Sequence, residues 1–291
     1  MLVGSALGQA LAIALFFLCP LEGWGHLVWQ VMVEWAAAAL IVVGIRRHRP
    51  ECAAAWYLFA VGLFLNAAGA AVEGLEQHLF AITVGPSLAD IFYMGLYPCL
   101  ILGLGRLLYR RCAIEEVEEL MVRTSACALF TVFLGIFAWE FIVWQTNSDH
   151  TLSLAKRLVL TAYPLGDLMV ISLLLRLMSG GGAGNPSFVL IVGSLCCFLG
   201  ADVGWMIYLR EGVLPSEAVR HLLVMTTMCA FALLAMAALH PGVRQIAPVP
   251  DGQRVRLRAL GWAALAVSAL AAPTVLLVQA LLDRLVAVRS L

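Results

Sequence analysis

Acidic side chains inside apolar segments are the residues of this chain with the clearest chemical potential. Glu34, Glu140, Asp167 and Asp202 lie within long apolar segments, and Asp90 lies at the start of another. A charged carboxylate near the centre of a membrane helix costs about 2.5–3.5 kcal/mol on insertion scales. We therefore expect these carboxyl groups to face the interior of a helix bundle, where protonation, water, a bound cation or a base at the rim stabilises them.

Tyrosine side chains accompany two of these acids. Asp90, Tyr93 and Tyr97 are spaced i, i+3, i+7 and share one face of a helix, and Tyr163 and Asp167 are spaced i, i+4. The proline that directly follows each of Tyr97 and Tyr163 removes a backbone donor and displaces the carbonyl four residues earlier. The pattern predicts two kinked helices that carry phenols, carboxylates and freed carbonyl groups, an arrangement suited to a ligand pocket.

These residues predict one polar cavity that opens to the outer side of a membrane and binds a small ligand or a cation. The expected ligand-binding residues are Glu34, Asp90, Tyr93, Tyr97, Glu140, Tyr163, Asp167 and Asp202. Two alternatives stay open: each acid only hydrogen-bonds a neighbouring helix, or His26 and His78 join the acids in a metal site. The histidine spacing is not diagnostic, so we predict no metal site, no catalytic residue and no cofactor.

The composition of the chain indicates the class of fold that positions these side chains. The 291 residues are 63% hydrophobic and only 12% charged, whereas a soluble domain is about one quarter charged. The mean hydropathy is +0.95. Eighteen Lys and Arg balance eighteen Asp and Glu, which gives no basic excess for a nucleic-acid partner. The chain is expected to be a multi-span helical membrane protein whose main partner is the lipid bilayer.

A membrane helix needs about 20 mainly apolar residues, and this criterion predicts nine spans in one integral membrane domain, residues 1–291. The fold class is therefore all-α, a polytopic helix bundle. The predicted spans are residues 2–19, 27–45, 53–75, 87–108, 124–146, 157–178, 187–209, 220–240 and 259–282.

Basic residues set the expected orientation of the bundle. Arginines are concentrated in and beside the loops that follow the second, fourth, sixth and eighth spans. Because cytoplasmic loops carry the excess of Lys and Arg, the N-terminus is expected in the cytoplasm. In this orientation the acidic residues of the spans all lie in the outer half of the bilayer or at its edge.

Several short motifs occur in a recognisable order: Pro86–Tyr93 followed by Tyr97-Pro98, then Ala162–Asp167, Ala201-Asp202 and Ala238–Pro241. This order resembles the N-terminal membrane region of actinobacterial cyclic-di-GMP signalling proteins, over about Trp56 to Ala280. The resemblance implies signal input at a bacterial cytoplasmic (inner) membrane. The chain contains no GGDEF or EAL segment, so the cyclase and phosphodiesterase activities of that family are not implied. A truncated or stand-alone member that signals through another subunit is expected.

The sequence therefore favours a membrane sensor that binds an unidentified small ligand or cation and relays to a cytoplasmic or membrane signalling partner. A proton- or cation-coupled transporter is the alternative, since intramembrane carboxylates and broken helices are also typical of transporters. An enzyme is not expected, because no nucleophile, metal-binding or nucleotide motif is recognisable. A scaffold subunit without a ligand is the remaining interpretation.

Overall fold

All regular elements in the described part of the chain are helices. The computed structural model describes residues 2–18, 24–80, 87–112, 117–139, 143, 146, 153–179, 184–211 and 216–246. The predicted all-α class is confirmed. The chain divides into two compact units, which are described separately: Met1–Leu107 with Gly182–Pro248, called unit 1, and Leu108–Gly181 with Val249–Leu291, called unit 2.

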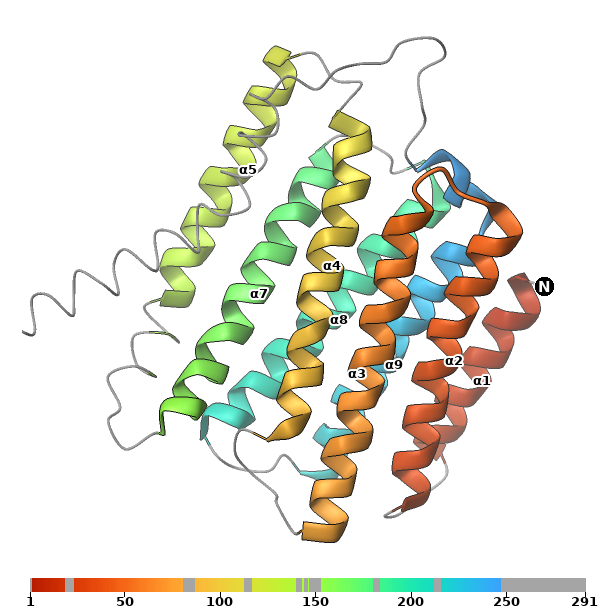
Figure 1. Ribbon diagram of the computed structural model, residues 1–291, viewed down its shortest axis with the longest axis vertical. Coiled ribbons are helices and arrows are strands. Elements are labelled where there is room, and N and C mark those ends of the chain that lie inside the picture. Colours follow the sequence, from red (N-terminus) through yellow and green to blue (C-terminus); the bar gives the residue numbers. More distant parts are fainter. Residues whose placement is uncertain are drawn as a thin grey trace, which may run out of the picture. The chain divides into compact units, whose positions relative to one another are not determined.

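Unit 1 is a bundle in which α2 and α9 are the central helices, each packed against several others. Its elements are α1 (Leu2–Leu18), α2 (Trp24–His48), α3 (Ala53–Phe80), α4 (Leu88–Cys112, as far as Leu107), α8 (Pro186–Glu211), α9 (Glu217–Leu239) and the 3₁₀ helix η2 (Pro241–Gln245). Helix α2 packs against α3 and α9, and α9 also contacts α1 and α8 (Figure 1). Large apolar side chains on the outer faces, such as Phe64 (52% exposed) and Val203 (57% exposed), suit contact with lipid.

Small residues allow the close approach of α2 and α9. A methyl group added to Gly44 of α2 would lie 2.5 Å from the carbonyl oxygen of Ala238 in α9. The two backbones therefore approach so closely that only glycine fits at this crossing, as in the small-residue contacts typical of membrane helices.

Unit 2 contains α5 (Val117–Ala138) and α7 (Leu154–Ser179), which pack together. Its apolar contacts centre on Trp139, Val143 and Leu168. The buried Arg176 of α7 donates from Nε to Thr124 Oγ1 of α5 at 3.1 Å. This polar bond complements the apolar contacts between the two helices.

Six described helices are long and apolar enough to cross a membrane: Trp24–His48, Ala53–Phe80, Leu88–Arg110, Leu154–Ser179, Pro186–Tyr208 and Glu217–Leu239. They correspond to the second, third, fourth, sixth, seventh and eighth predicted spans. The first and fifth predicted spans contain shorter apolar helices, Leu7–Phe16 and Thr124–Ile136. The ninth, residues 259–282, lies outside the described residues. By length and composition, these are the helices of a multi-pass membrane protein.

Candidate functional site

One end of unit 1, which we call the polar end, gathers the N-terminal turns of α2, α4 and α9 with the C-terminal turns of α1 and α3. Ring contacts between helices mark this end. The rings of His26 (α2) and His221 (α9) lie 4.9 Å apart, and Phe16 (α1) lies 4.3 Å from His26. Trp24 of α2 lies 4.6 Å from His78 of α3. Four helices of unit 1 therefore meet through aromatic and imidazole rings here.

A phenol–carboxylate hydrogen bond connects α4 to α3 at the polar end. Tyr93 Oη donates to Glu73 Oε2 at 2.5 Å. The ring of Tyr93 crosses α3 at Gly69, where an added methyl group would lie 2.8 Å from ring carbons. Gly69 thus leaves the space that brings the Tyr93 hydroxyl to Glu73, one helical turn further along α3.

A second bond of the same type connects α4 to α8. Tyr97, which is buried, donates from its hydroxyl to Asp202 Oδ2. The Tyr97 ring also lies 6.0 Å from that of Phe198, one turn before Asp202 on α8, in an edge-to-face arrangement. The structure therefore brings together Tyr97 and Asp202, two predicted site residues that are 105 positions apart in the sequence.

Asp90 caps the first turn of α4. Its Oδ2 accepts from the backbone N–H of Ser87 at 2.8 Å, and Ser87 Oγ accepts from the N–H of Ala89 at 3.1 Å. This reciprocal arrangement is a capping box. Glu76 of α3 adds a third bond, accepting from the N–H of Leu88 at 3.1 Å. Asp90 therefore has a local role in starting α4, besides any role toward a ligand.

Glu34 lies apart from these pairs, in the middle of α2. It is completely buried. Its Oε1 accepts from Gln30 Nε2 at 3.1 Å, and Asn66 of α3 is its other polar neighbour. Its Oε2 has no hydrogen-bond partner among the described residues. A fully buried, half-satisfied carboxyl group in a spanning helix is an uncommon feature.

The remaining predicted site residues belong to unit 2. Tyr163 and Asp167 lie on α7, which continues as one helix through Pro164, and Asp167 is buried at 9% exposure. Glu140 lies outside the described residues. The structure thus brings Tyr97 and Asp202 together within unit 1 and places Tyr163 and Asp167 on one helix of unit 2.

Sequence reasoning left Glu73 and the pairing of His26 with His221 out of the predicted site. The signal for Glu73 was its position near the end of an apolar segment, four residues after Gly69. Nothing in the spacing of His26 and His221 indicates that they meet. Within the described residues no three His, Cys, Asp or Glu side chains are grouped as metal ligands would be. His26 and His78 instead lie in separate ring contacts.

Comparisons with protein-family models, with curated proteins and with solved structures give no match to this chain.

Proposed function

We propose that this chain is the signal-input module of a bacterial cytoplasmic membrane, with nine spans and its N-terminus in the cytoplasm. The polar end of unit 1 would then face the outside. A small cationic or hydrogen-bonding ligand reaches that end, and the resulting change in the bundle is relayed to a cytoplasmic or membrane signalling partner.

The observation that carries this proposal is the pair of phenol–carboxylate bonds on α4. Tyr93 and Tyr97 lie one turn apart, and their partners, Glu73 and Asp202, lie on two different helices. A ligand that competes for these carboxylates loosens α4 from α3 and from α8 together. Pro98, directly after Tyr97, removes one backbone donor from α4 and makes that helix easier to bend. A ligand with different affinities for the tight and loosened forms shifts their populations, which is what a sensor requires.

Thermal unfolding of the purified full chain in detergent tests this mechanism. The probes are sodium, calcium and choline chlorides, compared with N-methylglucamine chloride at equal ionic strength. We expect at least one probe to change the melting temperature, and we expect Asp202→Asn and Tyr97→Phe to abolish that change. Glu217→Gln, which removes an exposed acid from the first turn of α9, is the matched control. An equal response in Asp202→Asn, Tyr97→Phe and the wild type would contradict the proposed site.

Glu34 favours a second candidate, a proton- or cation-coupled transporter. Its buried carboxyl group beside Asn66 resembles the intramembrane acids that carry protons or cations through transporters. In proteoliposomes, coupled proton or sodium uptake that is lost in Glu34→Gln or Asp167→Asn would establish transport and reject a purely sensory role. Absence of uptake in the wild type would reject the transporter.

A further inference from the structure

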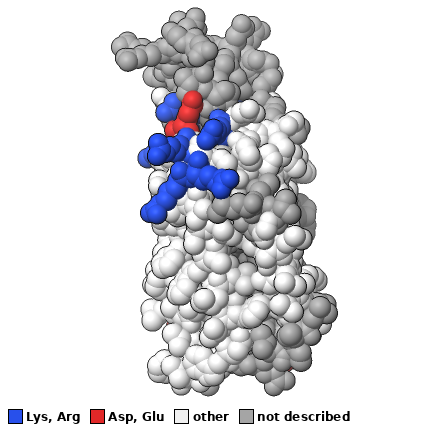
Figure 2. Space-filling view, turned by 90° about the vertical axis from the view of Figure 1, so that its right-hand side faces the viewer, with Lys and Arg blue, Asp and Glu red and all other residues white. Residues whose placement is uncertain are grey.

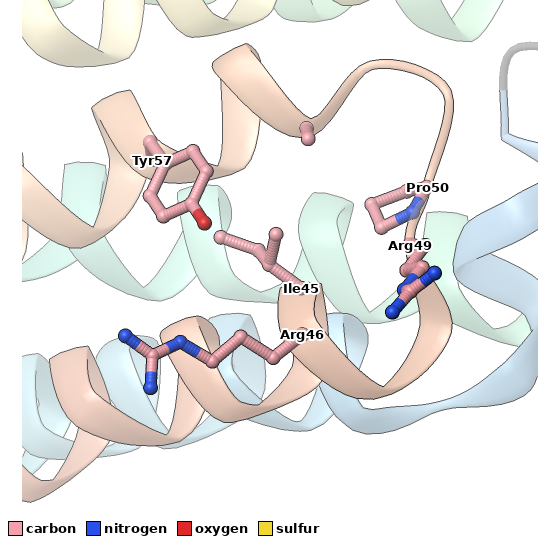
Figure 3. Close-up of a pocket in the computed structure, with 6 residues that line it drawn as sticks. Ile45, Arg46, Arg49, Pro50 and Tyr57 are labelled. Atoms are coloured by element: carbon pink, nitrogen blue, oxygen red, sulfur yellow. The ribbon is translucent and has the colours of Figure 1, made fainter.

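The turn between α2 and α3, at the opposite end of unit 1, borders an open surface cavity, which we call the arginine cavity and which the proposed function does not use. The cavity has a volume of about 510 Å³ and is lined by Ile45, Arg46, Arg49, Pro50, Ala53 and Tyr57. Figure 3 shows Arg46 extending from the last turn of α2, Arg49 from the residue after that helix, and Tyr57 from the start of α3. The two arginine side chains extend to opposite sides of Ile45 in this view, so a guanidinium group lies on each side of the apolar wall.

The backbone fixes Arg49 at the rim of this cavity. Its N–H donates to the carbonyl oxygen of Ile45 at 2.8 Å, and its φ is 45°, in the left-handed region that L residues seldom adopt. Pro50 follows and cannot continue α2. Both Arg46 and Arg49 are exposed, and the nearby exposed acid, Glu51, does not line the cavity. The cavity therefore presents two exposed guanidinium groups, whose positive charge complements that of an anionic phosphate group.

Basic residues are concentrated at this end of unit 1. Arg47 and Arg244 are exposed there in addition to Arg46 and Arg49. Figure 2 shows basic side chains gathered in one patch around an acidic side chain, while the described surface beside the patch carries almost no charge. A basic patch that borders an apolar helix surface is the arrangement that attracts anionic lipid.

An apolar groove continues from the arginine cavity along the same two helices. It has a volume of about 430 Å³ and is lined by Trp35, Ala38, Ala39, Val42, Tyr57, Ala60, Val61 and Phe64. Tyr57 lines both cavities. The stacked rings of Trp35 and Phe64, 5.5 Å apart, line the end of the groove that is farther from Arg46. Trp35 lies about three helical turns, roughly 16 Å, from Arg46, about the thickness of one leaflet of the hydrocarbon core.

We propose that the arginine cavity and the apolar groove together form a binding site for one anionic phospholipid. Arg46 and Arg49 contact the anionic head group from its two sides, with the Tyr57 hydroxyl at the boundary between head group and tail, and one acyl chain lies along the groove over Ala38 and Ala39. The site is independent of the proposed function at the polar end. Its charge favours an anionic over a zwitterionic lipid, and its apolar groove favours a lipid over a soluble phosphate compound.

Lipid binding to the purified full chain, measured by native mass spectrometry in detergent, tests the site. The probes are phosphatidylglycerol and phosphatidylcholine with identical acyl chains. We expect the wild type to prefer phosphatidylglycerol, and we expect R46Q combined with R49Q to weaken its binding about tenfold or more, as loss of two basic contacts predicts. Arg47→Gln removes one charge from the same turn outside the cavity and should weaken binding less than about twofold. Equal losses in R47Q and the double variant would overturn the proposal, because the charge would then act diffusely.

A second pair of variants tests the groove. Ala39→Leu fills it, whereas Ala36→Leu adds the same bulk to an exposed position outside it. We expect A39L to weaken phosphatidylglycerol binding at least about fivefold and A36L to leave it unchanged, with both proteins keeping the wild-type melting temperature in lipid-free detergent. If A39L binds phosphatidylglycerol as A36L does, the groove does not hold an acyl chain. If sodium phosphate alone displaces phosphatidylglycerol, the site takes a soluble anion. Either result would show that the lipid proposal is wrong.

Discussion

The two ends of unit 1 differ in the polar bonds that connect their helices, although carboxylates also accept from backbone N–H groups at the polar end. At the polar end, side chains of different helices bond to each other, as Tyr93 does to Glu73 and Tyr97 to Asp202. At the other end, which we call the arginine end, side chains bond to backbone carbonyl groups. His48 Nε2 donates to the carbonyl oxygen of Leu239 at 2.8 Å.

The arginine end is also connected through the turn after α9. Arg244 Nε donates to the carbonyl oxygen of His48 at 2.7 Å, and Asn185 Nδ2 donates to that of Gly242 at 2.9 Å. A backbone carbonyl group at the end of a helix is held in place by the helix, whereas the hydroxyl group of a tyrosine side chain can change from one acceptor to another. We infer that the arginine end is the fixed part of unit 1 and that the polar end is the part a ligand can rearrange.

The largest loss of stability is expected from a substitution that separates α2 from α9 at the arginine end. The methyl group of Gly44→Ala would lie 2.5 Å from the Ala238 carbonyl oxygen, so the two backbones must move apart. We expect the free energy of unfolding to fall by about 2 kcal/mol, as for overpacking, despite the better helix propensity of alanine. Denaturation in sodium dodecyl sulfate measures the loss.

The control for this substitution is Gly200→Ala in α8, where an added methyl group meets no atom of the described residues within 4 Å. We expect it to be neutral or slightly stabilising. Equal destabilisation by both substitutions would show that the close α2–α9 crossing does not hold the arginine end together.

At the polar end, a double-mutant cycle on Tyr97 and Asp202 measures how strongly their hydrogen bond holds α4 to α8. Tyr97→Phe removes the donor and Asp202→Ala removes the acceptor of the bond between α4 and α8, and their coupling energy should be about 1 kcal/mol, within the range for hydrogen bonds between membrane helices. Free energies of unfolding of the two single variants and the double variant give this value. A coupling energy near zero would mean that the bond does not hold α4 to α8.

The sequence predicted more of the fold than of the site. Apolar length alone located the six helices that meet the criteria for membrane spans, because the bilayer imposes a nearly fixed number of residues. It could not show that Tyr97 meets Asp202 rather than another acid, because contacts between distant helices depend on how the helices pack. Helical spacing only predicted that Asp90, Tyr93 and Tyr97 share a face of α4.

Asp90 illustrates what a residue type alone leaves open. An acid at the start of an apolar segment suggests a ligand-binding carboxylate or a helix cap, and the Ser87–Asp90 spacing is also that of a capping box. The structure shows the cap. The arginine cavity could not be predicted in the same way. Basic residues in a loop indicate which side of the membrane the loop lies on, but their spacing does not show that Arg46 and Arg49 line a cavity with Tyr57.

Two substitutions of Asp90 separate its cap from a ligand role. Asp90→Ala removes the acceptor for the Ser87 N–H and should reduce the free energy of unfolding by about 1 kcal/mol, whereas Asp90→Asn keeps a side-chain oxygen and should cost only a few tenths. Hydrogen exchange at the first turn of α4 should accelerate in the alanine variant alone. Equal losses of stability would indicate that the negative charge of Asp90, rather than its cap, stabilises the polar end.

The smallest expected effect comes from Arg244 at the arginine end. Arg244→Met removes the donor to the His48 carbonyl oxygen at the C-terminus of α2, but that carbonyl lies near an exposed side chain and water can replace the lost bond. We expect a loss of about 0.5 kcal/mol in the free energy of unfolding, at the low end of the range for a hydrogen bond. Arg46→Met removes one positive charge from the last turn of α2, two residues before His48, without removing a backbone contact, and should leave stability in lipid-free detergent nearly unchanged. If Arg46→Met costs as much as Arg244→Met, net charge rather than the bond to His48 stabilises this end, and the contrast between the two ends loses one of its supports.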